Sequence, residues 1–128
     1  MFPINKVEKP TMSLLIKIMQ FIARHHRKKG EHELPDSELF VERYRTMTPA
    51  ERAETLEDAA NQWEVEHNED LDYKTSLVDL MKLTGQDFSL KHRRELAAEI
   101  GWSGDVKDTA AMNQALYPIV LQRLEIVY

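Results

Sequence analysis

The sequence predicts an all-α protein, an array or bundle of about six short helices. Apolar residues recur at intervals of three and four, and no long window alternates apolar with polar residues. Serine, threonine, aspartate and glycine flank these segments at positions where helices begin and end. With 128 residues, of which 42% are hydrophobic and 30% charged, the chain has the size and composition of one folded domain.

Two helices are expected in the first third of the chain. Ser13 is a suitable N-cap for a first helix that runs to about Lys29, where Gly30 can end it in the left-handed conformation. The basic residues before Gly30 suit the negative C-terminal end of the helix dipole. Asp36 can cap a second helix, which carries Tyr44 on its apolar face.

The third helix has a well-marked start. Thr48, Pro49 and Glu51 have the pattern of a capping box with proline at the first helical position. Apolar residues then continue through Trp63 to about His67, after which a polar segment interrupts the pattern.

The same signals mark the fourth and fifth helices. Asp72 is the predicted N-cap of the fourth helix, and Gly85 is predicted to end it. Ser89 is expected to begin the fifth helix, which Gly101 ends directly after Ile100.

The last helix is predicted to begin after Asp108 and to extend to about Leu124. Pro118 lies inside its apolar pattern. Proline has no N–H to donate, and its ring clashes with the carbonyl four residues earlier, which here belongs to Gln114. We therefore expect the last helix to be kinked or broken into two pieces at Pro118.

The polar segment near residue 70 is the expected internal boundary of the chain. It separates an N-terminal helical segment of about three helices, residues 1–69, from a C-terminal helical module, residues 70–128. Because the whole chain has the length of a single domain, we expect the two parts to form one compact unit.

Three segments of the second part carry a family resemblance. Residues 72–83 read DYKTSLVDLMKL, residues 94–105 read RELAAEIGWSGD, and Met112-Asn113 is followed by Leu116 and a helical tail. In this order and spacing, over about residues 70–125, they resemble a small bacterial family described as a domain of unknown function, number thirty-five ninety-seven. The resemblance implies an array of short helices with no assigned activity. In that family a short segment and a flexible linker usually stand in place of residues 1–69.

Composition excludes several classes of chemistry. A net charge of −5 does not favour general binding to nucleic acid phosphates. The absence of cysteine excludes disulfides, thiolate metal sites and cysteine nucleophiles. Neither a Gly-x-Ser-x-Gly elbow nor a glycine-rich phosphate loop is present, so we expect no catalytic residue and no cofactor.

The histidines near the end of the first helix do not have metal-site spacing. His25 and His26 are adjacent and point about 100° apart on a helix, whereas a pair of helical ligands needs a spacing of three or four. We therefore predict no metal site.

The first 30 residues also resemble a secretory signal at first sight, because Lys6 and Lys9 precede a short apolar stretch. Lys17 interrupts that stretch, and a basic run at residues 24–29 follows it. The stretch is also much shorter than the roughly 20 apolar residues that cross a bilayer. We expect neither a signal peptide nor a membrane span, and a cytoplasmic protein.

The favoured functional interpretation is a non-enzymatic module that binds an unidentified protein or a second copy of itself through an apolar and aromatic surface. The candidate surface residues lie on the first helix and at the C-terminal end: Phe21, Ile22, His25, His26, Ile126, Val127 and Tyr128.

Two other interpretations stay open. The basic, amphipathic first helix is also typical of proteins that lie on an anionic membrane surface. The middle of the chain carries many carboxylates, which favour a solvated helix face but also suit an acidic inhibitor or a nucleic-acid mimic. These carboxylates belong to Glu51, Glu54, Glu57, Asp58, Glu64, Glu66, Glu69, Asp70 and Asp72.

Overall fold

The computed structural model describes residues 13–26, 37–105, 107 and 109–128, and for residues 37–40 the backbone alone. These residues form six α-helices and no strand, which confirms the predicted all-α class. The helices are α1 (Leu14–His25), α2 (Ser37–Thr46), α3 (Pro49–His67), α4 (Leu77–Leu83), α5 (Leu90–Glu99) and α6 (Thr109–Leu124).

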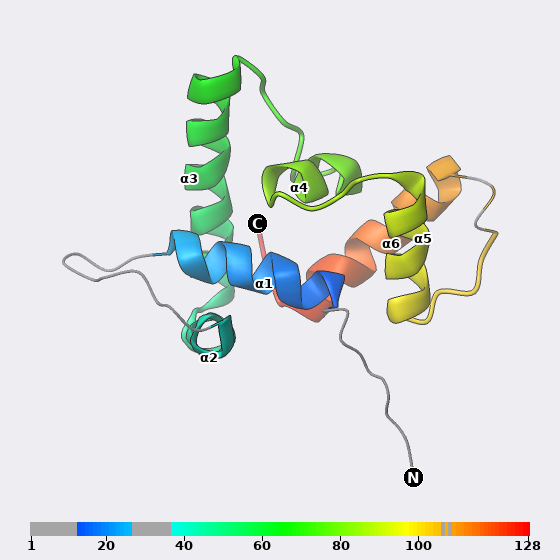
Figure 1. Ribbon diagram of the computed structural model, residues 1–128, viewed down its shortest axis with the longest axis horizontal. Coiled ribbons are helices and arrows are strands. Elements are labelled where there is room, and N and C mark those ends of the chain that lie inside the picture. The colour runs from blue at the N-terminus through cyan, green and yellow to red at the C-terminus, as the bar shows by residue number, and fades with distance from the viewer. Residues whose placement is uncertain (1–12, 27–36, 106, 108) are drawn as a thin grey trace, which may run out of the picture.

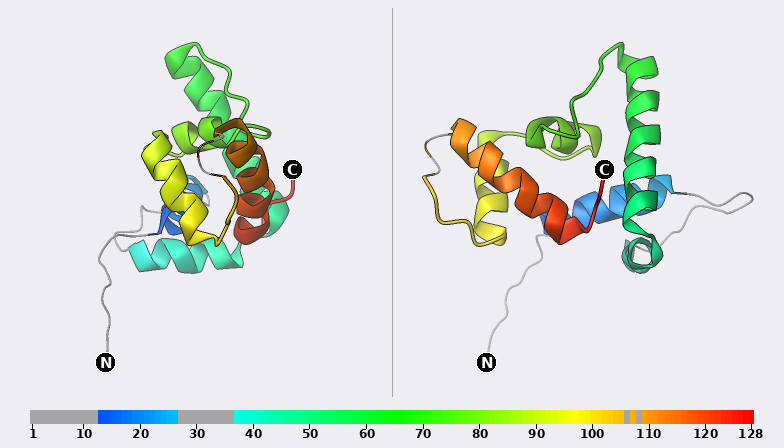
Figure 2. Two further views of the ribbon diagram at one scale, coloured as in Figure 1. Left: turned by 90° about the vertical axis from the view of Figure 1, so that its right-hand side faces the viewer. Right: turned by 180° about the vertical axis from the view of Figure 1, so that it is seen from behind.

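The helices cross one another at varied angles and do not align as a parallel bundle (Figures 1 and 2). Helix α1 lies across the lower part of α3, crosses and contacts α2, and reaches α6 with its other end. Helix α6 contacts α4 and α5, and α4 also contacts α3. The chain from α3 to α4 therefore returns from the far end of α3 toward the centre of the molecule.

One apolar core receives side chains from all six described helices. Ile18 and Ile22 of α1, Leu56 of α3, and Leu116 and Val120 of α6 are among the fully buried side chains. Their spacing of four within α1 and within α6 places each pair on one helix face. Since burial of such a side chain contributes about 1.5–3 kcal/mol, this shared core is the main stabilising feature of the fold.

Of the four predicted helix starts that lie within the described residues, three are confirmed, at Ser13, Thr48 and Ser89. The Ser13 hydroxyl accepts the N–H of Ile16, and Thr48 and Glu51 form the reciprocal bonds of a capping box. The prediction for α4 was wrong: its N-cap is Ser76, whose hydroxyl accepts the N–H of Asp79 at 3.2 Å. Asp72 begins the preceding turn, which inserts residues 73–75 before the helix starts.

The predicted glycine stops are confirmed at Gly85 and Gly101, which have φ values of +72° and +78°. Each follows the last residues of its helix, and the N–H groups of the glycine and of the residue after it return to helix carbonyls in the Schellman pattern. The predicted stop at Gly30 and the predicted caps Asp36 and Asp108 lie outside the described residues. Helix α1 ends at His25 in the structure, before the predicted end near Lys29.

Helix α6 continues through Pro118 as one helix, so the break into two pieces that we considered does not occur. Pro118 lies on the exposed face of α6, opposite the buried Leu116 and Val120. On that face water can bind the carbonyl that loses its helix hydrogen bond, which explains why the proline is tolerated.

Candidate interaction surface

The candidate residues of α1 do not share one surface. Ile22 is fully buried in the core, because it lies one turn beyond the buried Ile18 on the same helix face. Phe21 is half-buried and packs on the exposed His25, with ring centroids 4.3 Å apart. Most of the apolar face of α1 therefore lies inside the protein.

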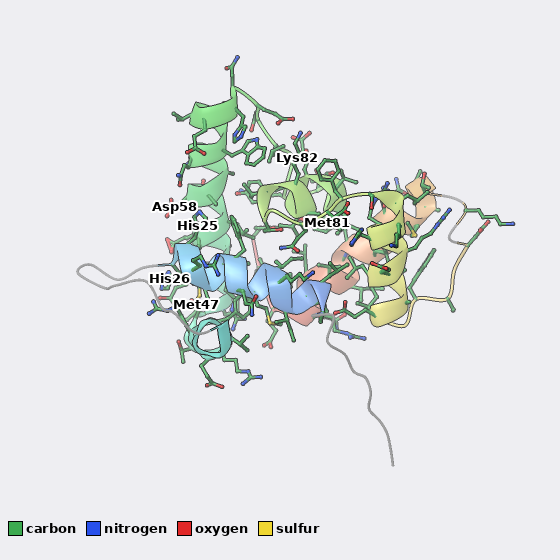
Figure 3. All side chains as sticks on the ribbon, viewed as in Figure 1. His25, His26, Met47, Asp58, Met81 and Lys82 are labelled. Atoms are coloured by element: carbon green, nitrogen blue, oxygen red, sulfur yellow. The ribbon has the colours of Figure 1, made fainter. Side chains whose placement is uncertain are left out.

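The half-buried His26 lies in a pocket of about 300 Å³ at the end of α1, close to Met47 (Figure 3). Its backbone carbonyl accepts a hydrogen bond from Arg43 at 2.9 Å, and its ring Nδ1 lies 3.4 Å from the Thr55 hydroxyl. Within the described part of the chain, no group of three or more His, Asp or Glu side chains is placed to hold a metal ion.

The candidate residues at the C-terminal end are also partly buried and partly exposed. Ile126 is buried, because its N–H bonds to the Leu121 carbonyl at 3.1 Å and this turn directs the side chain into the core. Val127 and Tyr128 stay at the surface, with 66% and 41% of their area exposed. Of the predicted apolar surface, these two side chains remain accessible.

Tyr128 belongs to a cluster of three tyrosines that also contains Tyr73 and Tyr117. The Tyr117 hydroxyl donates to the Tyr73 carbonyl and lies 3.3 Å from the Tyr128 hydroxyl. The rings of Tyr73 and Tyr128 meet edge to face, 5.8 Å apart. Burial is the main cause that raises the pKa of all three hydroxyls, that of Tyr128 to about 12. This tyrosine cluster fixes the segment before α4 against α6 and the C-terminal end.

Tyr73 also lines a pocket of about 310 Å³, whose other lining residues come from α3 and from the segment that returns from α3 to α4. One wall consists of four α3 residues at the spacing i, i+3, i+4 and i+7, which is one helix face. They are Glu57, Ala60, Asn61 and Glu64. Residues 70–75 form the other wall. We call this site the acidic pocket.

Four carboxylates and one ammonium group line the acidic pocket, which gives its walls a formal charge of −3. The carboxylates belong to Glu57, Glu64, Asp70 and Asp72, and the ammonium to Lys74. Among the described residues, none of these four carboxylates forms an ion pair or a side-chain hydrogen bond. No described side chain therefore neutralises their charge.

A neighbouring carboxylate just outside the pocket is bound within the protein. Glu69 accepts hydrogen bonds from the Lys82 ammonium at 2.9 Å and from the Trp63 indole N–H at 3.2 Å. The hydrogen bond from Lys82, followed by that from Trp63, lowers the pKa of Glu69. These contacts tie the end of α3 to α4, on which Figure 3 shows Lys82, and so hold the two walls of the acidic pocket together.

The acidic pocket was not predicted as a unit. The sequence indicated its carboxylates as part of a longer solvated run, and it gave no reason to select Asn61 or Tyr73. The available signal was the helical spacing of residues 57, 60, 61 and 64, followed closely by a second acidic segment at residues 70–72.

A protein-family model described as "Domain of unknown function (DUF3597)" matches residues 14–126. The match begins at the first residue of α1, so it extends far beyond the region near residues 70–125 in which the resemblance was found. No curated protein and no solved structure matches the chain. Among the described residues, no helix is long and apolar enough to cross a membrane.

Proposed function

The chain belongs to the DUF3597 family, and we propose that it is a non-enzymatic helical module that binds another protein. The family description assigns no activity, so the proposal is based on the surface of the molecule. The observation that carries it is the acidic pocket, whose four carboxylates have no partner among the described residues, next to the exposed side chains of Val127 and Tyr128.

The two parts of this surface adjoin through the tyrosine cluster. Tyr73 lines the acidic pocket and also packs against the ring of Tyr128. Protein interfaces commonly combine an aromatic or apolar centre with a polar rim, and tyrosine is favoured in them because it is rigid and amphipathic. Val127 and Tyr128 supply the apolar part, and the carboxylates of the acidic pocket supply the polar part.

The charge of the surface indicates the kind of partner. The pocket walls carry a formal charge of −3, and the whole chain has a net charge of −5. Such a field increases the association rate of a positively charged partner and disfavours an acidic one. We therefore expect a partner protein with a basic segment next to an apolar one.

Affinity capture from the native host tests the proposal with a matched pair of valine variants. Val127→Asp places a charge in the apolar part, and we expect the amount of captured partner to fall by about tenfold. Val65→Asp makes the same change at an 86% exposed valine on α3 that does not line the acidic pocket, and capture should be unchanged. Equal capture by wild type and Val127→Asp, or a chain that captures no protein and remains monomeric, contradicts the proposal.

A further inference from the structure

We propose that the acidic pocket is a binding site for one basic side chain, an arginine guanidinium or a lysine ammonium, which the partner inserts between α3 and residues 70–75. The inference rests on the proposed function and specifies the chemistry that the partner must present. It is carried by the unpartnered carboxylates, by the buried hydroxyl of Tyr73, and by the position of Lys74.

The carboxylates surround the pocket on both walls. Glu57 and Glu64 lie two turns apart on one face of α3, while Asp70 and Asp72 lie on the opposite segment. Since α3 and α4 are tied together by the contacts of Glu69, the walls are in place before a ligand arrives. A preformed site binds more tightly because less conformational freedom is lost on binding.

The Tyr73 hydroxyl is a second and independent indication of a ligand. Tyr73 is 6% exposed and lines the pocket, yet its hydroxyl has no hydrogen-bond partner among the described residues. Buried hydroxyls are almost always hydrogen-bonded. Burial, and then the charges of Glu57 and Asp58 on α3, raise the pKa of Tyr73. An N–H group that enters between the walls can donate to the phenol oxygen and to a carboxylate at once.

Lys74, the cation of the pocket walls, does not neutralise the carboxylates. Its ammonium lies 6.0 Å from the ring centroid of Tyr73 and 5.9 Å from that of Tyr128, on the aromatic side of the site. It forms no ion pair with a described residue. The carboxylates therefore keep their charge for an external cation.

The geometry favours an extended organic cation over a metal ion. Calcium and magnesium need several oxygen ligands converging within about 2.0–2.6 Å of one point. No group of three or more acidic or histidine side chains converges in this way in the described part of the chain. Separate carboxylates around a pocket of about 310 Å³ suit a side chain that carries several N–H donors on a flexible stem.

An NMR titration of the full chain tests the site without a partner protein. The probes are N-acetyl-arginine amide and N-acetyl-lysine amide, with N-acetyl-citrulline amide as the neutral isostere, all at constant ionic strength. We expect saturable shifts of the backbone N–H groups of Asn61, Glu64 and residues 70–75 with a charged probe, and no saturable shift with citrulline. Comparison of the arginine probe with the lysine probe shows which cation binds more tightly. Magnesium chloride is the metal control, and we expect no saturable shift with it.

Two variants make the test specific. Tyr73→Phe removes the unpartnered hydroxyl but keeps the ring, so we expect several-fold weaker binding with an unchanged melting temperature. Glu57→Gln should also weaken binding several-fold. Glu66→Gln removes the same charge from the opposite face of α3 and is the matched control, for which binding should be nearly unchanged.

Four outcomes of these experiments would contradict the inference. Shifts spread over all acidic parts of the surface, equal shifts with citrulline, a response to magnesium alone, or unchanged affinity in both Tyr73→Phe and Glu57→Gln would each overturn the inference. Because the probes are small molecules, this failure is separate from a failure of the proposed function. Capture that depends on Val127 would persist without a basic side chain in the pocket, and a positive titration would stand without captured protein.

Discussion

The guanidinium of Arg52 lies 4.2 Å above the ring of Tyr44, and together these two side chains join three helix ends. Arg52 of α3 donates to the carbonyl of Tyr44 at 2.7 Å and to those of Leu124 and Glu125 at 3.3 and 2.9 Å. The Tyr44 hydroxyl donates to the Leu124 carbonyl at 2.6 Å. The buried charge thus faces carbonyl groups at the C-terminal ends of α2 and α6, where the helix dipole is negative.

This arrangement predicts that Arg52 is essential for stability. Arg52→Ala removes the donor to the Glu125 carbonyl and opens a cavity, while the carbonyls of Tyr44 and Leu124 keep the Met47 N–H and the Tyr44 hydroxyl as donors. We expect the variant to lower the free energy of unfolding by about 2–4 kcal/mol. Arg52→Lys should recover little, because one ammonium cannot reproduce the planar fork of donors. Urea denaturation measures both effects.

Arg45→Ala is the matched control for this prediction. Arg45 lies on α2 and pairs with Glu42 at 2.7 Å, but 68% of its side chain is exposed. An exposed pair of this kind contributes about 0–1 kcal/mol. A loss at Arg45 as large as that at Arg52 would contradict the structural role assigned to Arg52.

The burial of Arg52 also shows where sequence reasoning ends. Caps and stops such as Ser13, Thr48 and Gly85 were predicted because each acts on backbone groups within four residues. The acceptors of Arg52 in the last helix lie 72 and 73 positions away, so no local pattern marks this arginine as buried. Ile126 was predicted at the surface for a different reason, since the sequence does not mark the turn from Leu121 to Ile126 that directs this side chain into the core.

Long-range contacts also explain why the sequence did not predict the N-cap of α4 or the acidic pocket. Ser76 and Asp72 are both good N-caps, and the choice between them depends on the burial of Tyr73 between them. The tyrosine cluster that buries Tyr73 includes residues 44 and 55 positions further along the chain. The carboxylates of the acidic pocket were visible in the sequence, but its two walls face each other because the chain turns back after α3.

A second prediction concerns the end of α6. Glu125 has a φ of +54° and takes the position after the helix that glycine takes after α4 and α5. A side chain with Cβ is strained there, so Glu125→Gly should raise the free energy of unfolding by about 1 kcal/mol. Asn68→Gly, at the other non-glycine residue with a φ of +54°, should gain less because asparagine tolerates this conformation better. Thermal unfolding measures the two variants side by side, and a loss of stability in Glu125→Gly would refute the assignment.

A third prediction follows from the tyrosines. The chain has four tyrosines, and the pKa of each is raised, with burial as the first cause. A raised pKa means that the folded state holds the proton more tightly than the unfolded chain. The resulting stability is fully present below pH 10 and is lost as the pH rises through about 12, the value for Tyr128.

Absorbance at alkaline pH measures this effect. We expect little tyrosinate in the folded protein at pH values where the urea-unfolded chain is half ionised, and ionisation that coincides with loss of helical circular dichroism. Titration of the four hydroxyls near their ordinary pKa of 10 in a protein that remains folded would contradict the burial of the tyrosine cluster.

The last prediction concerns the contact between α3 and α4 that supports the acidic pocket. The hydrogen bond from Lys82, followed by that from Trp63, lowers the pKa of Glu69 below its ordinary 4.5. The folded state therefore binds the Glu69 proton more weakly than the unfolded chain does. The stabilisation from ionised Glu69 is present above its ordinary pKa and is lost as the pH falls through the lowered pKa. Glu69→Gln should lower the melting temperature at neutral pH, and the difference from wild type should shrink as the pH is lowered to about 3.

Glu66→Gln, which removes a nearby charge without touching Lys82, should show no such convergence. A difference between wild type and Glu69→Gln that stays constant over this pH range would mean that the ion pair with Lys82 does not join the two helices.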